Sequence, residues 1–525
     1  MKHWRVLVLA VAATLLAACA SPRPQPAAPP RAADADAAHY LDAIRNNPPL
    51  LEAFLRRFPK GGDLHNHLSG AVYAESLVAW GSEAGLCIER RTMTLVGPKP
   101  CKGDATALAE AVRDPAFYAA VVDAFSMRDF VPTSGWSGHD QFFATFGRFG
   151  AATDGRTGEM LAEAATRAAA DHAAYLELML SPGMSDARKL GAAAGWDDDL
   201  GALETRLDTP AMAAAVAKAR AVLDDGERKM RTLLACGTPA AKPGCEVTVR
   251  YLAQVVRIFP PEQVFAQIVL AHRLVLADPR VVGFNLVGPE DDPVALRDYD
   301  QQMRMLGYLG RQHPTVRLTL HAGELALGLV PPEELRSHIR QAVEVAGAQR
   351  IGHGVDLMQE QQPLQLAAEM ARRHVLVEIN LTSNDLILGV SGDRHPFPTY
   401  RQLGVPVALS TDDEGVSRID LTHEWLRAVL TYQLTYADLK QLARNSLEYA
   451  FLSGDSLWIT TQPYVLAPPC AQAAPLDPVV PPGCQALLQA SDKAREQWRL
   501  EVELAKVDTS IHSSDTHVPD VAEAQ

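Results

Sequence analysis

The sequence has few aromatic residues, no excess of positive charge and no long apolar run beyond its N-terminus. Aromatic residues make up 6% of the 525 residues, and 63 acidic against 49 basic residues give a formal net charge of −14. No basic patch with interleaved aromatics occurs. The chain therefore lacks the electrostatic footprint of a protein that binds nucleic acid or anionic membranes. Hydrophobic residues still make up 47%, enough for a large buried core.

The N-terminal apolar run, Val6 to Ala18, follows Lys2 and Arg5 and is short for a membrane span. A charged start, a short apolar stretch and small residues before a break are typical of a secretory signal. The run ends in the letters LAAC, which resemble a bacterial lipobox. We therefore expect an exported periplasmic or cell-surface lipoprotein, anchored to a membrane by acyl chains on Cys19. A cleaved signal without lipid is the alternative.

The six cysteines after Cys19 contain no CxxC spacing of the kind that binds structural zinc. They form three couples that are local in sequence, each bracketing a loop with Gly or Pro. The oxidising compartment that the signal implies favours disulfides over buried free thiols, which remain the alternative. The expected pairs are 87–101, 236–245 and 470–484.

Short apolar runs alternate with Ala/Leu/Glu/Arg-rich helical stretches over most of the chain. Several runs are β-branched and nearly continuous, as expected for parallel strands that are covered on both faces. The runs lie at 63–68, 174–180, 247–256, 281–287, 316–322, 350–353, 375–381 and 405–410. Strands alternating with helices in this way predict an α/β fold, a (β/α)8 TIM-type barrel.

Two stretches exceed a minimal barrel. Residues 69–173 follow the first strand and residues 183–245 follow the second. We expect both to be helical insertions that form a lid or pocket wall over the end of the barrel where active sites lie. The predicted units are a signal (1–19), a Pro/Ala-rich tether (20–38), the barrel domain (39–455) and a C-terminal extension (456–525) with one helix and a polar tail.

Four clusters of polar side chains end predicted strands, and two of them contain candidate metal ligands and an acid. His65 and His67 are alternate residues of one strand, so both imidazoles point to the same face and can share a metal ion. His321 can add a third imidazole, and Glu324 projects from the turn after it. Taken singly, surface histidines and an acidic helix N-terminus explain these residues equally well.

The other two clusters contain His353, Asp412 and Asp413. His353 lies between glycines, which suits a base or a water-orienting group in a cleft, although a turn histidine is the alternative. Together with Glu414, the two aspartates form a run of three acids after an apolar strand, which is costly unless paired, metal-bound or solvated, although an acidic helix cap is the alternative. All four clusters fall at the carboxyl ends of strands, where barrel enzymes place their active sites. Three imidazoles and one carboxylate suit one Zn²⁺ per chain.

Eight segments carry a family resemblance. They are FPKGGDLHNHLSG (58–70), YLELMLSP (175–182), VVGFNLVGPED (281–291), HAGE (321–324), RIGHG (350–354), EINLTSN (378–384), HPF (395–397) and GVPVALSTDDEG (404–415). These segments resemble the adenosine deaminase family of the amidohydrolase superfamily, and most of all its extracellular, growth-factor-type branch. The resemblance implies zinc-dependent hydrolysis of adenosine, and of 2′-deoxyadenosine, to inosine and ammonia.

The resemblance also implies a role for each site residue. The implied zinc ligands are His65, His67, His321 and Asp412. Glu324 would donate a proton to purine N1, and His353 would orient the attacking water and help to deprotonate it. Asp413 would hydrogen-bond purine N7 and the attacking oxygen, and the backbone of Gly288 would donate to purine N3.

Three residues depart from the pattern of the family. Ser69 stands where many members have an Asp that contacts the ribose, Asn285 replaces a common Asp and Met179 replaces a common Arg. These departures bear on ribose contacts and substrate range, and Ser69 is a candidate substrate-binding residue. The HxE and PCxxC pattern of the zinc deaminases that edit nucleic acid is absent from the sequence. We therefore expect a purine nucleoside as the partner and no nucleic acid.

Two other functions remain open. One is deamination of a modified adenosine or an adenine nucleotide on the same fold, although no Lys/Arg cluster for a phosphate lies beside the motifs. The other is a growth-factor-like binding or signalling module. We assign His338 to a surface or packing role and His395, which precedes Pro396, to structure.

Overall fold

The structure, a computed structural model, describes residues 32–514. The predicted signal, Cys19 and the first part of the tether lie outside these residues, as does the end of the polar tail. Within 32–514, no helix is both long and apolar enough to cross a bilayer.

Eight parallel strands form a single sheet in the order β1-β5-β6-β7-β8-β9-β10-β11. The strands are β1 (Gly61–His67), β5 (Ala173–Leu180), β6 (Thr248–Val256), β7 (Val281–Val287), β8 (Arg317–Ala322), β9 (Arg350–His353), β10 (Leu376–Ile379) and β11 (Val407–Leu409). The backbone N–H of His67 donates to Asp412 at 2.9 Å, and that of Asp412 donates to His65 at 2.8 Å, which closes the barrel. The predicted TIM-type fold is confirmed, and every predicted strand run overlaps a barrel strand.

Helices that follow the strands surround the barrel. They are α8 (Thr157–Ala170), α12 (Pro261–Ala277), α13 (Pro293–Gln312), α14 (His338–Gln341), α15 (Pro363–Arg372), α16 (Leu381–Leu388), α17 (Phe397–Gln402), α18 (Glu414–Ser417), α19 (Leu421–Tyr432) and α20 (Tyr436–Glu448). Capping side chains and prolines determine where several of these helices begin. In α13, the Asp292 side chain accepts from the backbone N–H of Val294, and Pro293 occupies the first turn, where it loses no hydrogen bond.

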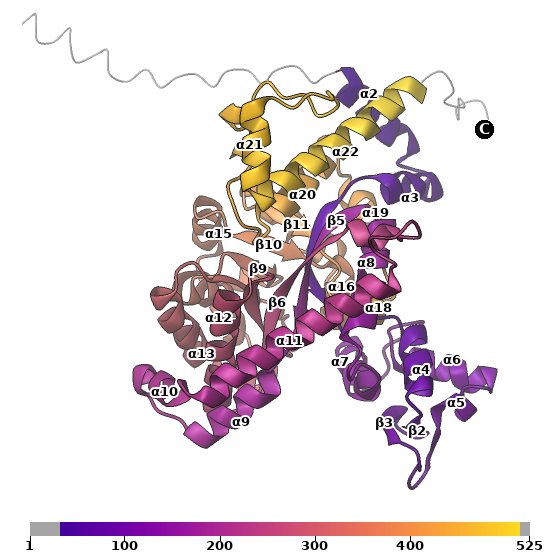
Figure 1. The fold of residues 1–525 in the computed structure, drawn as a ribbon, viewed down its shortest axis with the longest axis vertical. Coiled ribbons are helices and arrows are strands. Elements are labelled where there is room, and N and C mark those ends of the chain that lie inside the picture. Colours follow the sequence, from indigo (N-terminus) through magenta and orange to yellow (C-terminus); the bar gives the residue numbers. More distant parts are fainter. Residues whose placement is uncertain (1–31, 515–525) are drawn as a thin grey trace, which may run out of the picture.

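Both predicted insertions are present. The first contains α4 (Ala74–Glu83), α5 (Leu108–Ala111), α6 (Pro115–Ala124), α7 (Gly138–Phe149) and a small antiparallel sheet of β2 (Leu86–Glu89), β3 (Thr94–Pro98) and β4 (Ala105–Ala107). The second contains α9 (Met184–Ala194), α10 (Leu200–Leu207) and α11 (Pro210–Leu233), with α11 lying along the outside of the molecule (Figure 1). The small sheet was not predicted, because its strands are too short to show a clear period.

The three predicted disulfides are confirmed as Cys87–Cys101, Cys236–Cys245 and Cys470–Cys484. The first links β2 to the loop after β3, the second joins the end of α11 to the approach to β6, and the third lies in the C-terminal extension. Each closes a short loop, which lowers the entropy of the unfolded chain.

The two ends of the described chain are more helical than the sequence predicted. Helices α2 (Ala32–Ile44) and α3 (Pro48–Arg57) precede the barrel, so residues 32–38, which were predicted to belong to the tether, are helical. Alanine is the best helix former, and Ala37 and Leu41 are fully buried, so tertiary packing of α2 against α22 overrides the tether-like composition.

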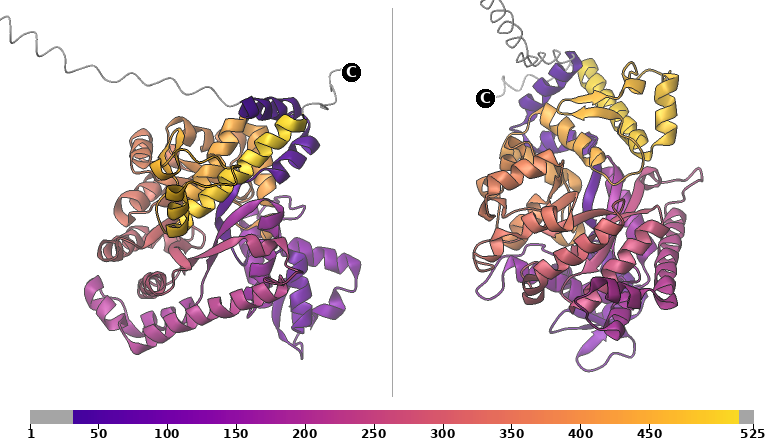
Figure 2. Two further views of the ribbon diagram at one scale, coloured as in Figure 1. Left: turned by 45° about the horizontal axis from the view of Figure 1, so that its top comes forward. Right: turned by 90° about the vertical axis from the view of Figure 1, so that its left-hand side faces the viewer.

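The C-terminal extension has two helices where one was predicted. It contains β12 (Trp458–Thr461), β13 (Tyr464–Leu466), α21 (Pro482–Ala490) and α22 (Asp492–Ser514). Helix α22 runs into the predicted polar tail because Leu504 and Ile511 are buried and Asp508 accepts a hydrogen bond from Tyr436 at 2.6 Å. Helices α2 and α22, at the two ends of the described chain, pack together at one end of the molecule, and α4 to α7 lie at the other (Figures 1 and 2).

Candidate active site

The structure brings the four predicted metal ligands to one point. One nitrogen from each of His65, His67 and His321 and one oxygen of Asp412 lie within 4.8 Å of one another, and all four residues are buried. His67 Nε2 lies 3.2 Å from His321 Nε2, and Asp412 Oδ1 lies 3.4 Å from His65 Nε2 and 3.2 Å from His67 Nε2. The residues come from β1, from β8 and from the segment after β11, as their positions in the sequence predicted.

The three imidazoles are each held at Nδ1 from outside the cluster. The contacts are Glu378 Oε2 to His65 at 2.7 Å, Gln254 Oε1 to His67 at 2.6 Å and the Asn285 side chain to His321 at 3.3 Å. Acceptor oxygens at Nδ1 leave Nε2 of His65 and His67 without a proton, and His65 Nε2 is buried with no hydrogen-bond partner among the described residues. At His321 the nearer atom is Asn285 Nδ2, but Asn285 Oδ1 is buried without a partner in residues 32–514, and the reversed amide supplies an acceptor there as well. With all three Nε2 atoms free, the residues fit a divalent cation.

A buried ion-pair network supports the first of these rings. Arg350 Nε donates to Glu378 Oε1 at 2.6 Å, and Arg350 Nη2 donates to Glu177 Oε2 at 2.5 Å. The guanidinium also lies 3.9 Å from the ring centroid of Phe451. Burial of two carboxylates around one arginine is stable only because every charge is paired, so the network fixes Glu378 and through it His65.

Glu324 and His353 form a second cluster of side chains with the metal ligand Asp412. One donor atom from each of the three lies within 4.8 Å of the others, and Glu324 Oε1 lies 3.5 Å from His353 Nδ1. Burial, with the neighbouring charges of Asp412 and Glu290, raises the pKa of the Glu324 carboxyl well above its ordinary value. A carboxyl group in this state can donate a proton at neutral pH.

The turn that carries Glu324 is held by Glu290, for which no role was predicted. Glu290 accepts from the backbone N–H groups of Gly323 at 3.1 Å and Glu324 at 2.8 Å. Its carboxylate also lies 2.6 Å from Nδ1 of His338, which stacks on Tyr299 with ring centroids 3.6 Å apart. His338 is therefore a buried residue that holds this turn in place. The acid in the segment VVGFNLVGPED was the signal that could have pointed to Glu290.

Two site residues have backbone conformations that non-glycine residues rarely adopt. His353 has φ 68° and Asp412 has φ 61°, both in the left-handed region. Such strain persists only where the surrounding structure holds it, and it clusters at functional sites. At Asp412 the backbone hydrogen bonds to β1 on both sides provide that support.

A cavity of about 440 Å³ opens beside these two clusters of side chains, the metal-ligand cluster and the cluster of Glu324, His353 and Asp412. Its polar floor includes Glu324 and Asp413, and the predicted substrate-binding residues Ser69 and Gly288 also line it. Gly288 has φ 108°, which favours glycine at the position where its backbone faces the cavity. The structure therefore gathers every predicted substrate-binding residue in one cavity.

The wall of this cavity is apolar and comes partly from the first insertion. The apolar side chains that line it are Phe142, Phe143, Phe146, Val256, Ile258, Val287, Pro289 and Ile387. The three phenylalanines belong to α7, so the first insertion forms a pocket wall as predicted. The prediction for the second insertion was wrong, because none of the residues that line the cavity comes from 183–245. That insertion packs against α8 and α12 instead.

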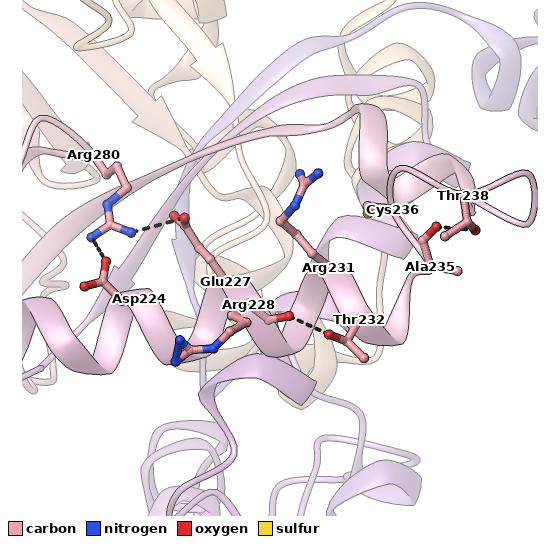
Figure 3. A pocket seen from close by; sticks show the side chains of 9 residues that line it. All are labelled: Asp224, Glu227, Arg228, Arg231, Thr232, Ala235, Cys236, Thr238 and Arg280. Carbon is pink, nitrogen blue, oxygen red and sulfur yellow. Dashed lines mark hydrogen bonds and ion pairs between the residues drawn. The ribbon is translucent and has the colours of Figure 1, made fainter.

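A second hollow lies on the outside of α11 and has no part in this site (Figure 3). It is lined by charged residues of α11 and by Arg280, which is already paired with Asp224 at 2.7 Å and Glu227 at 3.1 Å. No predicted site residue lines it. It is a solvated charge network on the surface.

Comparison with known proteins identifies the family. The family model described as adenosine deaminase matches residues 152–457. Adenosine deaminase of Enterococcus faecalis is 35% identical over 185 residues, which are 35% of this chain and 49% of that protein. Adenosine deaminase of Clostridium perfringens is 32% identical over 174 residues, 33% of this chain and 47% of that protein. The chain thus spans about half the length of these curated relatives.

A solved structure shares the fold. The apo structure of the N6-methyl-AMP deaminase from Arabidopsis thaliana is 20% identical, with a TM-score of 0.51, and the match covers 77% of this chain and 94% of that chain. The similarity supports the barrel architecture. Because the family model covers more than half of the chain, the protein belongs to the adenosine deaminase family.

Proposed function

We propose that this protein is a zinc-dependent deaminase that converts adenosine and 2′-deoxyadenosine to inosine-type nucleosides and ammonia. One observation carries the proposal: a buried His/Asp cluster, a buried acid and an apolar cavity of about 440 Å³ meet at the carboxyl end of one barrel. Family membership gives independent support.

Zinc held by the three histidines and Asp412 would lower the pKa of a water from about 15.7 to about 7, which supplies a nucleophile at neutral pH. Glu324, kept protonated by burial, would give its proton to purine N1 and make C6 electrophilic. The oxygen of one water would add to C6 and the C6–N6 bond would break. Of the two protons of that water, one would go to the amino group, which leaves as ammonia, and the other would restore the Glu324 carboxyl. Gly288 and Asp413 would hold N3 and N7 of the purine.

The lining of the cavity supports a nucleoside as the substrate. Among its lining residues, all within the described chain, none is Lys or Arg, so a substrate phosphate would find no cation there. The wall of phenylalanines on α7 suits the uncharged faces of base and sugar, and Ser69 offers one hydroxyl.

Kinetics with a substrate panel test this proposal. We expect zinc-loaded protein to deaminate adenosine with kcat/KM of about 10⁴ M⁻¹ s⁻¹ or more, followed by the change in ultraviolet absorbance as inosine forms. AMP should react about 100-fold less well, because leaving its phosphate unpaired in an apolar cavity costs about 3 kcal/mol. A higher kcat/KM for AMP than for adenosine would show that the substrate is a nucleotide and not a nucleoside. Absence of turnover with every adenine compound would reject the proposed deaminase activity.

We further propose that the protein acts outside the cytoplasm, in purine nucleoside scavenging, as a lipoprotein anchored through Cys19. The N-terminal LAAC sequence supports the anchor. Cys19→Ala should move the protein from the membrane fraction to the soluble or unprocessed fraction when the two are separated by centrifugation. Wild-type protein found wholly in the soluble exported fraction would contradict the anchor.

A further inference from the structure

A chain of hydrogen bonds links the backbone at Phe397 to the ring of His353. The bond at the Phe397 end determines which atom donates and which accepts at every later link. The backbone N–H of Phe397 lies 3.1 Å from His395 Nδ1. A backbone N–H only donates, so His395 Nδ1 is an acceptor. Burial, with the nearby charge of Arg427, lowers the pKa of His395 to about 4, so its ring is neutral at pH 7. The single ring proton of His395 is therefore on Nε2.

This proton determines the orientation of the next side chain, Asn384, on α16. His395 Nε2 lies 3.0 Å from Asn384 Oδ1, so the amide accepts at its oxygen. Its nitrogen is then turned the other way and lies 2.9 Å from His353 Nδ1. An amide nitrogen only donates, so His353 Nδ1 is an acceptor and carries no proton. The neutral ring of His353 consequently has its proton on Nε2.

The other groups around His353 agree with this assignment. The side-chain nitrogen of Asn380 lies 3.4 Å from the same Nδ1, which leaves Asn384, at 2.9 Å, as the donor to its single lone pair. Glu324 Oε1, at 3.5 Å from Nδ1, is beyond the range of a direct hydrogen bond. His353 Nε2 is buried and, among the described residues, has no hydrogen-bond partner. The ring packs against His65 and His321, with centroids 4.9 Å and 5.1 Å away, so His353 lies against the proposed metal cluster.

We propose that Asn384 and His395 are positioning residues that hold His353 in its Nε2–H tautomer, so that this imidazole donates a hydrogen bond to the attacking oxygen. In that state His353 orients the oxygen toward C6 and takes neither proton of the attacking water; these protons end on the departing amino group and on Glu324. This revises the role that the family resemblance implied. The effect on catalysis rests on the proposed function, whereas the tautomer itself does not. His395, assigned to structure from the sequence, gains an indirect role in the site.

The tautomer can be observed directly. Full-length zinc-loaded protein labelled with ¹⁵N only in histidine gives one pair of ring-nitrogen signals per histidine in long-range ¹H–¹⁵N spectra, and the His353 pair is the one that His353→Gln removes. We expect a protonated Nε2 and an unprotonated Nδ1 at pH 7. A proton on Nδ1, alone or together with Nε2, would overturn the proposal. Because this readout needs no turnover, it stands even if the protein deaminates no adenine nucleoside.

Asn384→Asp reverses the polarity of the chain with little change in shape. A carboxylate only accepts, so it should draw the His353 proton to Nδ1 and leave Nε2 without one. We expect the NMR pattern to reverse and kcat for adenosine to fall about 100-fold, with KM changed by less than about threefold. His395→Gln retains a hydrogen-bond donor toward Asn384, so it should lower kcat for adenosine by less than about tenfold.

Asn47→Asp makes the same chemical change at the N-cap of α3, where the side-chain oxygen accepts from the backbone N–H of Leu50 at 3.3 Å, a role that a carboxylate also fills. It serves as the matched control and should leave the His353 signals and kcat within about twofold of wild type. A fall in kcat for Asn384→Asp with an unchanged His353 tautomer would overturn the positioning role, since it would indicate a merely structural defect. Failure of that variant to fold leaves the wild-type spectrum to decide.

Discussion

Glu324→Gln should lower kcat for adenosine by about 10³-fold or more, while KM changes by less than about threefold. Glutamine keeps the size of the side chain and its place at the cavity floor, but it has no carboxyl proton to give to purine N1. The backbone N–H of Glu324 still donates to Glu290 at 2.8 Å, so the turn should keep its position. Steady-state kinetics over a range of adenosine concentrations separate the two constants.

Glu369→Gln is the matched control, because this residue lies on the outer helix α15 and pairs with Arg372 at 2.6 Å. It should retain kcat within about twofold, as expected for an exposed ion pair. Activity above about a tenth of wild type in Glu324→Gln would show that this carboxyl is not the essential acid. If Glu324→Gln abolished turnover but left the phenotype of cells unchanged, a binding or signalling role would gain support.

The barrel could be predicted because its signals are local. Several strands are short β-branched runs beside helical stretches, and the carboxyl ends of parallel strands must meet at one end of a barrel. The spacing of His65 and His67 fixed their shared face by strand alternation alone. These two facts are enough to place the metal ligands, Glu324, His353 and Asp413 together from the sequence alone.

The remaining features depend on contacts between distant segments. Arg350 lies in a recognised motif, but its partners Glu177 and Glu378 come from β5 and β10, and no pattern within one strand reveals that pairing. The His395–Asn384–His353 chain likewise joins α16 to the loop before α17 and to β9. Tertiary packing also determines the helical structure of the two chain ends and the position of the second insertion. The alanine-rich sequence of that insertion does not indicate which face of the barrel its helices cover.

His67→Ala should remove the bound metal and the activity together. His67 Nε2 lies 3.2 Å from both His321 Nε2 and Asp412 Oδ1, so its loss opens the centre of the ligand set. Structural and catalytic zinc sites depend on each of their few protein ligands. We expect metal analysis to find about one zinc per wild-type chain and less than about a tenth of that in the variant, with kcat reduced by about 10³-fold or more.

His272→Gln provides the control, since His272 is a buried histidine of α12 that packs on Phe284 with ring centroids 4.9 Å apart. It should keep the zinc and the activity within about threefold. The comparison with Glu324→Gln is decisive, because that variant should lose turnover yet retain its zinc. If His67→Ala kept a full complement of metal, the four converging side chains would not be the ligands; if it kept turnover without metal, the nucleophile would have another source.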